Sequence, residues 1–429
     1  MARQVLKFGG TSVRDIDHIK HAATIIARAA SQGDQVVTVV SAMGHTTDNL
    51  ISMADAITSD ANDREMDMLL ATGEQVSIAL LTMAVQQLGV KARSFTGAQA
   101  GIVTEPVYQH ARIKSIQTAN LDEALNEGYV AIVAGFQGVS EQGELCTLGR
   151  GGSDTTAVAL AAALKAECCD IYSDVNGVYT ADPRVFPYAR KLSVISFEEM
   201  LEMAAAGAQV LNARSVELAM NNRVPVRLRS TFEPEDLGTL VTHKHASPDY
   251  VVCGIASDTN RVAFNLRLPR RGRKANNKAA VQYLEGVSAM FQALTELGIT
   301  TDMVTLLGRD GDLGPELIFT VEKRSARKVE HVIEELSAEL GYPEVRADGD
   351  IARISVIGNG LSCRRGVVAA IFDILCSASI PVQMLTTGDI RVTALVPAKY
   401  KDAAVQRIHE RFCIYPPADG RVIPESRVA

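Results

Sequence analysis

Residues 5–12 read VLKFGGTS, a short apolar run that ends in a lysine, a phenylalanine and two adjacent glycines, and a helical pattern follows from about residue 17. The apolar run predicts a β-strand at residues 5–8. Glycines at 9 and 10 let the backbone approach an anion closely, while Lys7 and free amides supply positive potential. The spacing is not that of a Walker A loop, and a solvent-exposed lysine before a turn is the plain alternative. The stretch therefore predicts a strand, a turn suited to phosphate and a helix.

The same order of elements continues through the first half of the chain. Further β-branched runs predict strands at residues 36–41, 92–96, 130–135, 169–173 and 225–229. Helical patterns lie between them, at residues 17–31, 49–57, 73–88, 121–127, 155–166 and 196–206. This alternation is typical of a largely parallel sheet covered by helices on both faces. We expect a three-layer α/β/α domain over residues 1–245.

The second half repeats a shorter pattern. A strand-like VAFNLRL at 262–268, a long helical pattern and GITTDMVTLL at 298–307 are followed by ARISVIGNG at 352–360, a helical pattern and IPVQMLTTGD at 380–389. The two copies lie roughly 90 residues apart, and two copies are too few for a solenoid. We expect two related α+β modules, at residues 246–345 and 346–429.

Composition limits the function. The 429 residues carry a formal net charge of -7, which argues against nucleic acid as the main partner because such binding needs a basic face. A local cluster of cations can still bind an anionic small molecule. No secretory signal or membrane-spanning apolar stretch is evident, so we expect a cytoplasmic protein with no membrane partner. The seven cysteines lack zinc-site spacing, which favours buried thiols over a metal site or disulfides.

The sequence TLGRGGSDTTAVALAAAL at residues 147–164 is the second chemical signal. Three glycines surround Arg150 and lead through Ser153 and Asp154 into an apolar helix. Helix capping explains the serine or the aspartate, but not the glycines around the arginine. A helix N-terminus favours anions, and arginine matches a carboxylate bidentately. We therefore expect a ligand site here.

A third cluster, YSDVNGVYTADPR at residues 172–184, follows the strand at 169–173. It is rich in turn residues, and Tyr179 can offer a ring to a nucleobase while Arg184 reaches phosphate. A plain loop is the alternative. Two shorter segments, SAMG at 41–44 and TGEQ at 72–75, also lie at strand-to-helix turns. The alternative for Glu74 is a purely structural role, because the helix dipole favours an acidic residue in the first turn of a helix. Because ligands bind at the carboxyl ends of parallel strands, we expect all these turns to converge on one cleft.

These five segments, together with the tandem C-terminal modules, resemble the aspartate kinases of the amino-acid kinase superfamily, whose C-terminal modules are called ACT. The matching segments read KFGGTSV, SAMG, TGEQVS, LGRGGSDTTA and DVNGVYTADPR. The resemblance spans nearly the whole chain and implies the amino-acid kinase fold. It also implies transfer of the γ-phosphoryl group of ATP, with Mg²⁺, to the side-chain carboxylate of L-aspartate, the first step of aspartate-family amino-acid biosynthesis.

The resemblance also implies a role for each site residue. Lys7 and Asp154 would be catalytic, Lys7 offsetting charge on the transferred group and Asp154 orienting Lys7. Glu74 would hold the amino group of aspartate and Arg150 its α-carboxylate. The remaining residues of the acceptor side would be Ser41, Thr47, Gly151 and Ser153. The nucleotide side would consist of Lys7, Phe8, Gly9, Gly10, Ser173, Asp174, Tyr179, Asp182, Arg184, Gln209 and Val210.

The chain departs from the family pattern at a few positions. Where relatives usually read GAKVLHPR, it reads GAQVLNAR, so Gln209, Asn212 and Ala213 replace a lysine, a histidine and a proline. Asn176 replaces a usual aspartate. These changes bear on nucleotide binding, whereas Lys7, Arg150 and Asp154 are present, so we expect an active enzyme.

Two alternatives stay open at this point: a kinase for another acidic amino acid, and a weakly active regulatory paralogue that binds amino acids. The ACT resemblance implies a lysine or threonine effector. It also implies a homodimer or higher homo-oligomer formed through these modules.

Overall fold

The computed structural model describes residues 2–58, 60–208, 210–243, 251–267, 277–308, 315–340 and 343–412. The chain forms two compact units. The first comprises Met1–Thr180 and Tyr188–Cys253, and the second comprises Ala181–Pro187 and Gly254–Ala429. Gln209, expected on the nucleotide side, lies outside the described residues.

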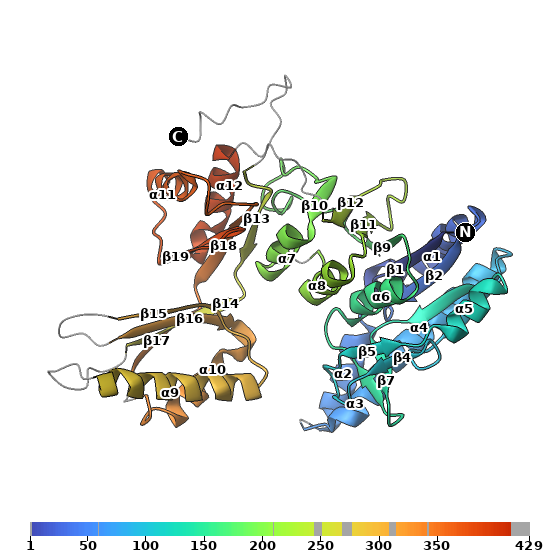
Figure 1. The fold of residues 1–429 in the computed structure, drawn as a ribbon, viewed down its shortest axis with the longest axis horizontal. Helices are drawn as coiled ribbons and strands as arrows, with labels where there is room; N and C mark the ends of the chain where they lie inside the picture. The colour runs from blue at the N-terminus through green and yellow to red at the C-terminus, as the bar shows by residue number, and fades with distance from the viewer. Residues whose placement is uncertain are drawn as a thin grey trace, which may run out of the picture. The chain divides into compact units, whose positions relative to one another are not determined.

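An eight-stranded sheet forms the centre of the first unit, in the order β10-β12-β11-β9-β1-β2-β6-β3 (Figure 1). Every neighbouring pair is parallel except β11 and β12. The strands are β1 (Arg3–Phe8), β2 (Gln35–Val40), β3 (Ala92–Phe95), β6 (Val130–Ala134), β9 (Cys168–Ser173), β10 (Val194–Ser196), β11 (Val226–Ser230) and β12 (Thr239–Thr242). The expected largely parallel sheet is thus confirmed, with β1 between β2 and β9.

Helices cover both faces of this sheet, as expected for three layers. On one face α1 (Ile16–Ser31) and α4 (Thr72–Gln87) pack on each other and on a core that contains Leu6 and Phe8 of β1. On the other face α6 (Gly152–Ala163) contacts β1, β2 and β9 and is covered by α8 (Ala213–Asn222). The other helices are α2 (Thr46–Ile57), α3 (Asp63–Leu70), α5 (Ala119–Asn126) and α7 (Phe197–Ala205), with a 3-10 turn at Gly10–Val13. Because side chains alternate along a strand, Lys7 points to the α6 face, opposite Leu6 and Phe8.

A small four-stranded sheet, in the order β5-β4-β7-β8, is not predicted by the sequence patterns, and neither are β10, β12, α3 and α8. The strands of the small sheet are β4 (Ile102–Thr104), β5 (Ile113–Ile116), β7 (Gln137–Ser140) and β8 (Leu145–Thr147). Each has three or four residues, too few to produce a readable alternation. Strand β8 leads directly into the glycine-rich segment around Arg150.

The helical run Asp63–Gln87 would be long and apolar enough to cross a membrane, but half of its most apolar window is buried inside the protein. Helix α4 packs against α1, β3 and β6. Core helices of folded proteins commonly have this character. The run is therefore explained as a core helix.

The second unit contains two antiparallel four-stranded sheets with helices. One has the order β13-β18-β20-β19 and the other β15-β16-β14-β17. The strands are β13 (Gly254–Asp258), β14 (Arg261–Arg267), β15 (Asp302–Leu307), β16 (Glu316–Glu322), β17 (Glu344–Asp348), β18 (Ile351–Ile357), β19 (Met384–Thr387) and β20 (Arg391–Pro397). The helices are α9 (Asn277–Glu296), α10 (Ala326–Glu335), α11 (Val367–Ser377) and α12 (Lys401–Arg411), with 3-10 turns at Lys323–Ser325 and Ala398–Tyr400.

Strand pairing in the second unit does not follow chain order. Strand β13 precedes the first module's helix, yet it pairs with β18 in the other sheet. Strand β17 crosses the expected boundary at residue 345 and pairs with β14. The sheet formed by β14, β15, β16 and β17 is therefore inserted in the chain between β13 and β18, which a division into 246–345 and 346–429 does not express.

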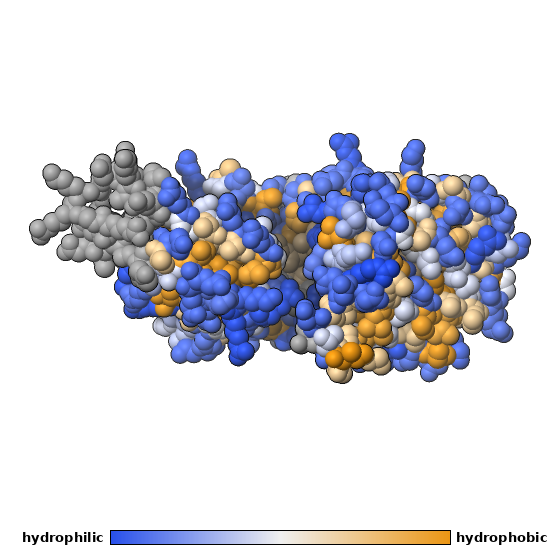
Figure 2. All heavy atoms as spheres, turned by 90° about the horizontal axis from the view of Figure 1, so that it is seen from below, coloured by the Kyte–Doolittle hydropathy of each residue, from blue (hydrophilic) through white to orange (hydrophobic). Residues whose placement is uncertain are grey.

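The surface seen in Figure 2 is mostly hydrophilic, with separate hydrophobic patches. Exposed apolar side chains occur on β15, an edge strand of its sheet, at Val304, Leu306 and Leu307. An edge strand with exposed apolar side chains is a ready surface for pairing with another chain.

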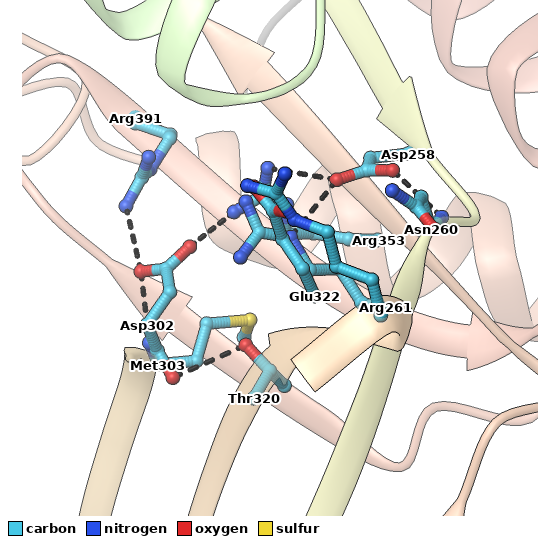
Figure 3. Close-up of polar contacts among 10 residues, drawn as sticks. Asp258, Asn260, Arg261, Asp302, Met303, Thr320, Glu322, Arg353 and Arg391 are labelled. Atoms are coloured by element: carbon cyan, nitrogen blue, oxygen red, sulfur yellow. Dashed lines mark hydrogen bonds and ion pairs between the residues drawn. The ribbon is translucent and has the colours of Figure 1, made fainter. Parts of the chain in front are cut away.

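A buried arginine joins strands from both sheets of the second unit (Figure 3). Arg353 of β18 is 1% exposed and forms ion pairs with Asp302 of β15 and, at 3.4 Å, with Asp258 of β13. Arg261 also pairs with Asp258, at 3.0 Å, and Arg391 approaches Asp302 at 3.8 Å. The guanidinium is thus matched by two carboxylates, as buried charges require.

The segment Ala181–Pro187 leaves the first unit and joins the second. Its Phe186 is buried against the ring of His409 in α12, with ring centroids 4.5 Å apart. The first four residues of this segment, 181–184, belong to the motif expected on the nucleotide side.

Candidate active site

The turn after β1 depends on its glycines. The Gly9 amide donates to the carbonyl oxygen of Tyr172 at 3.2 Å, which fixes the turn beside β9. A Cβ on Gly10 would lie 2.9 Å from the backbone oxygen of Ala42. Only glycine therefore fits where the turns after β1 and β2 meet.

Lys7 and Asp154 form the central ion pair of the site. The Lys7 Nζ lies 2.6 Å from an oxygen of Asp154, and the two side chains are 10% and 15% exposed. Lys7 comes from β1 and Asp154 from the first turn of α6, so the pair forms where a helix N-terminus faces the central strand. At such a terminus free amides favour anions, and the ammonium adds a positive charge.

The N-terminus of α6 is shaped by close packing. Gly151 precedes the helix with φ of 73°, in the left-handed region that glycine enters without strain. Ser153 is buried, and a Cβ on Gly135, at the end of β6, would lie 2.7 Å from the Ser153 Cβ. The helix can approach the sheet this closely only because residue 135 is glycine.

Glu74 is buried in the first turn of α4 and is only partly hydrogen-bonded. Its Oε1 accepts a bond from the Ala42 amide at 3.0 Å, whereas Oε2 is buried without a hydrogen-bond partner among the described residues. Burial raises the pKa of Glu74 from 4.5 to about 7, against the lowering effect of the backbone bonds. A buried carboxylate oxygen without a partner marks a place where a ligand donor can bind.

The segment after β2 lies against this carboxylate. The Ser41 amide donates to the Phe8 carbonyl oxygen at 3.1 Å, so the turns after β1 and β2 are joined. A Cβ on Gly73 would lie 2.8 Å from the Ala42 Cβ, which holds the start of α4 against that turn. Thr47 is half-buried in the first turn of α2.

Arg150 is exposed, and among the residues that the structure describes its guanidinium has no ion-pair partner. Its backbone is held from α8: the Asn212 side-chain amide donates to the Arg150 carbonyl oxygen at 3.3 Å. Arg214 donates to the Leu148 carbonyl oxygen at 3.2 Å. Asn212, flagged above as a departure, thus caps α8 and supports the arginine segment.

The nucleotide-side residues are arranged in local contacts. Ser173 accepts a bond from the Val175 amide at 3.1 Å, and Tyr179 donates to Asn176 at 2.7 Å. Arg184 pairs with Asp182 at 2.8 Å, and this guanidinium lowers the pKa of Asp182.

Two further residues were expected on the nucleotide side. Asp174 is exposed, and Val210 is half-buried just before α8.

The structure therefore brings together one set of predicted residues and leaves another apart. Contacts link the turns that carry Lys7, Gly9, Gly10, Ser41, Glu74, Ser153 and Asp154. Asp182 and Arg184 belong by contact to the second unit, while Tyr179 remains in the first. Sequence reasoning missed Ala42, whose amide binds Glu74. It also missed Asp67 of α3, a buried carboxylate that accepts hydrogen bonds from the amide and the hydroxyl of Thr147 in β8. The available signal was an aspartate at a buried position of an otherwise amphipathic helix, since such a carboxylate needs partners.

The arrangement suits two anions and one ammonium group. Backbone amides and Lys7 can bind a phosphate group, Arg150 can bind a carboxylate, and Glu74 can bind an ammonium group. Among the described residues there is no group of three or more metal-ligating side chains. Asp154 could contribute a carboxylate oxygen to a magnesium ion that phosphate oxygens and water would mainly ligate, because Mg²⁺ needs few protein ligands, whereas the Lys7 ammonium has no lone pair for a metal.

Comparison with known proteins places these features in a family. The model of the amino acid kinase family matches residues 2–230, and an ACT domain model matches residues 354–412. An aspartokinase of Geobacillus stearothermophilus is 42% identical over 408 residues, which cover 95% of this chain and 96% of that protein.

Two solved structures of E. coli aspartokinase III share the fold along nearly the whole chain. The complex with aspartate and ADP, called the R-state, aligns with a TM-score of 0.76 at 26% identity, covering 95% of this chain and 99% of the other. The complex with lysine and aspartate, called the T-state, aligns with a TM-score of 0.74 at 27% identity and the same coverage.

Proposed function

This chain belongs to the aspartokinases of the amino acid kinase family, and from that premise we propose how its residues carry out the reaction. The enzyme transfers the γ-phosphoryl group of ATP to the side-chain carboxylate of L-aspartate. The product is 4-phospho-L-aspartate, an acyl phosphate, which would open the biosynthesis of the aspartate family of amino acids.

The observation that carries the proposal is the unpartnered Oε2 of buried Glu74. An ammonium group there would supply the missing donor and a compensating charge. Arg150 would bind the α-carboxylate bidentately, since its guanidinium is exposed and unpaired among the described residues. The acceptor carboxylate would then face the N-terminus of α6, bounded by Ser41, Thr47, Gly151 and Ser153.

Phosphoryl transfer must bring a carboxylate against a polyanion, so repulsion has to be cancelled locally. Lys7 and the amides near Phe8, Gly9 and Gly10 would hold the phosphates, and Asp154 would orient the Lys7 ammonium through their 2.6 Å contact. Since the acceptor is already ionised at neutral pH, the reaction needs no general base. Magnesium arriving with ATP would further neutralise the phosphate oxygens.

The nucleotide would extend along the segment after β9. Its contacts would come from Ser173, Asp174, Tyr179, Asp182 and Arg184, and from Gln209 and Val210 before α8. To receive a phosphate, Arg184 would exchange part of its contact with Asp182, an exposed pair that solvent already weakens.

Regulation and assembly are part of the same proposal. A lysine complex is known for one similar structure, so we assign an effector of the lysine or threonine kind to the ACT-like modules. We further propose a homodimer, or a higher homo-oligomer, through these modules in the cytoplasm. The exposed apolar edge of β15 supports this assembly.

Trapping the acyl phosphate with hydroxylamine tests the activity and its acceptor. Hydroxamate formation with ATP and aspartate alone is the expected result. Equal formation with glutamate would indicate a broader acidic acceptor range. No product with any acid would contradict catalysis and favour a regulatory protein. Titrating lysine and threonine into the same assay tests the effector, because allostery requires measurable coupling between two sites.

A further inference from the structure

Asp67 of α3 is a fully buried carboxylate that has no part in the reaction outlined above. Both of its oxygens lie 3.1 Å from the Gln109 amide. It also accepts bonds from the Thr147 amide at 2.8 Å and the Thr147 hydroxyl at 2.6 Å. One side chain therefore ties α3 to the segment around residue 109 and to the end of β8.

These three segments lead to the two groups assigned to aspartate recognition. Helix α3 ends at Leu70 and continues through Ala71 into α4, which carries Glu74. Thr147 ends β8 and is followed after two residues by Arg150. The third segment packs there too, since a Cβ on Gly149 would lie 2.9 Å from the Gln109 carbonyl oxygen.

A second buried contact reinforces the same junction. Gln137 of β7 is 1% exposed, and its side-chain amide donates to the Ala71 carbonyl oxygen at 3.0 Å. Strands β8 and β7 of the small sheet therefore hydrogen-bond to the α3–α4 junction at two points, Asp67 and Ala71. On its far side the arginine segment is held by Asn212 and Arg214, through the more exposed contacts already described.

The chemistry of Asp67 argues for more than packing. An ionised carboxylate is costly to bury, and an apolar side chain would fill the same space at lower cost. What the carboxylate adds is direction, because charge-assisted hydrogen bonds to fixed amides set position closely. Such precision matters where two groups must bind the two ends of one small zwitterion.

We propose that Asp67 is a positioning residue that sets the separation between Glu74 and Arg150 and thereby the enzyme's affinity for its amino-acid acceptor. The inference rests on the proposed roles of those two residues. Asp67 touches neither reactant; it acts through α4 and through the segment from Thr147 to Arg150. Displacing it should weaken aspartate binding and leave the nucleotide side unaffected.

Steady-state kinetics of Asp67→Asn test the proposal. The amide keeps the size of the side chain but replaces one acceptor oxygen with a donor facing backbone amides. We expect KM for aspartate to rise about tenfold or more while KM for ATP changes less than about twofold. Asp63→Asn is the matched control, since exposed Asp63 bonds the side chain of the same Gln109 at 2.6 Å. Its kinetics should match the wild type.

Thr147→Val and Thr147→Ser keep the test informative if Asp67→Asn folds poorly. Valine removes only the hydroxyl bond and should raise KM for aspartate selectively, whereas serine should restore it. Equal losses for both substrates, in step with a lower Tm, would show that Asp67 is merely structural. An unchanged KM for aspartate in a folded Asp67→Asn would overturn the proposal outright. Wild-type protein that forms no aspartyl hydroxamate would instead refute the proposed function.

Discussion

The two units each bury charged groups, but they satisfy them differently. In the second unit, Arg353 is matched by Asp258 and Asp302 (Figure 3). In the first unit, Glu74 keeps one buried oxygen without a partner, and Arg150 has no ion pair among the described residues. A buried cation balanced by two carboxylates indicates a structural role, whereas a buried carboxylate with no counter-charge indicates a group that awaits a ligand.

The difference has a thermodynamic side. Burial raises the pKa of Glu74 to about 7, so keeping this carboxylate charged opposes folding. Arg353 is also buried, and burial lowers its pKa, but Asp302 and Asp258 counter that effect. Loss of Lys7 or Arg150 should therefore mainly impair catalysis, whereas loss of Arg353 should mainly destabilise the fold.

The largest expected effect lies at the centre of the catalytic cluster. Lys7→Ala should lower kcat about a thousandfold, because it removes the ammonium that offsets charge on the transferred group. A coupled ADP-release assay measures this, with circular dichroism as the folding control. Near-normal turnover would refute the role of Lys7.

Changes to Arg353 and its two carboxylate partners should lower the free energy of unfolding instead. Arg353→Ala leaves Asp258 and Asp302 without their buried cation and should cost about 3 kcal/mol of unfolding free energy. Arg324→Ala, which breaks an exposed pair with Glu322, should cost less than about 1 kcal/mol. Urea unfolding of both variants provides the comparison. If the two losses were equal, the contrast between buried and exposed pairs would fail.

Acceptor recognition should show a smaller, selective loss. Arg150→Ala should raise KM for aspartate about thirtyfold and leave KM for ATP nearly unchanged, because one bidentate charged contact is lost. Arg150→Lys should recover only part of this, since an ammonium cannot bind bidentately. An equal rise in KM for aspartate and for ATP would contradict a specific role of Arg150 in binding the aspartate α-carboxylate.

The smallest expected effect is the pH dependence of the contribution of Glu74 to the free energy of unfolding. Folded Glu74 has a pKa raised from 4.5 to about 7, so between these values the native state holds a proton that the unfolded state has lost. The contribution of Glu74 to stability therefore falls as pH rises through this window. Glu74→Gln should stabilise the protein at pH 8 by on the order of 2 kcal/mol and have no such effect near pH 4. Thermal unfolding at both pH values measures it.

The same protonation should appear in aspartate binding. Below about pH 7 the free enzyme increasingly holds Glu74 neutral, which weakens its attraction for an ammonium group. KM for aspartate should rise as pH falls from 8 to 6, with the slope absent in Glu74→Gln. A pH-independent KM in the wild type would argue against contact between Glu74 and the substrate.

Local chemistry explains what could be predicted from the sequence. The turn of Lys7, Gly9 and Gly10 and the segment around Arg150 each combine a strand or helix signal with residues whose geometry is intrinsic, such as glycine. Their convergence followed from the rule for parallel strands. Asp67 was missed because its partners, Gln109 and Thr147, are far away in sequence and sit beside strands too short to recognise.

The order of strands in the sheets of the second unit could not be predicted from the sequence either. The sequence patterns did not predict β17, and the alternation of side chains along a strand carries no information about which strand it pairs with. Pairing β13 with β18 depends on a contact across the whole inserted sheet. The repeat between the two modules was readable, whereas their interleaving was not.

The short excursion from Ala181 to Pro187 bears on how the enzyme can be divided. A fragment ending near residue 245 would retain Phe186 but lose α12, so the phenyl ring would give up its contact with His409 and meet water. Asp182 and Arg184 sit on the same stretch and would lose their anchor. The catalytic half expressed alone should consequently tend to aggregate and bind nucleotide weakly, even though it keeps the glycines on the phosphate side.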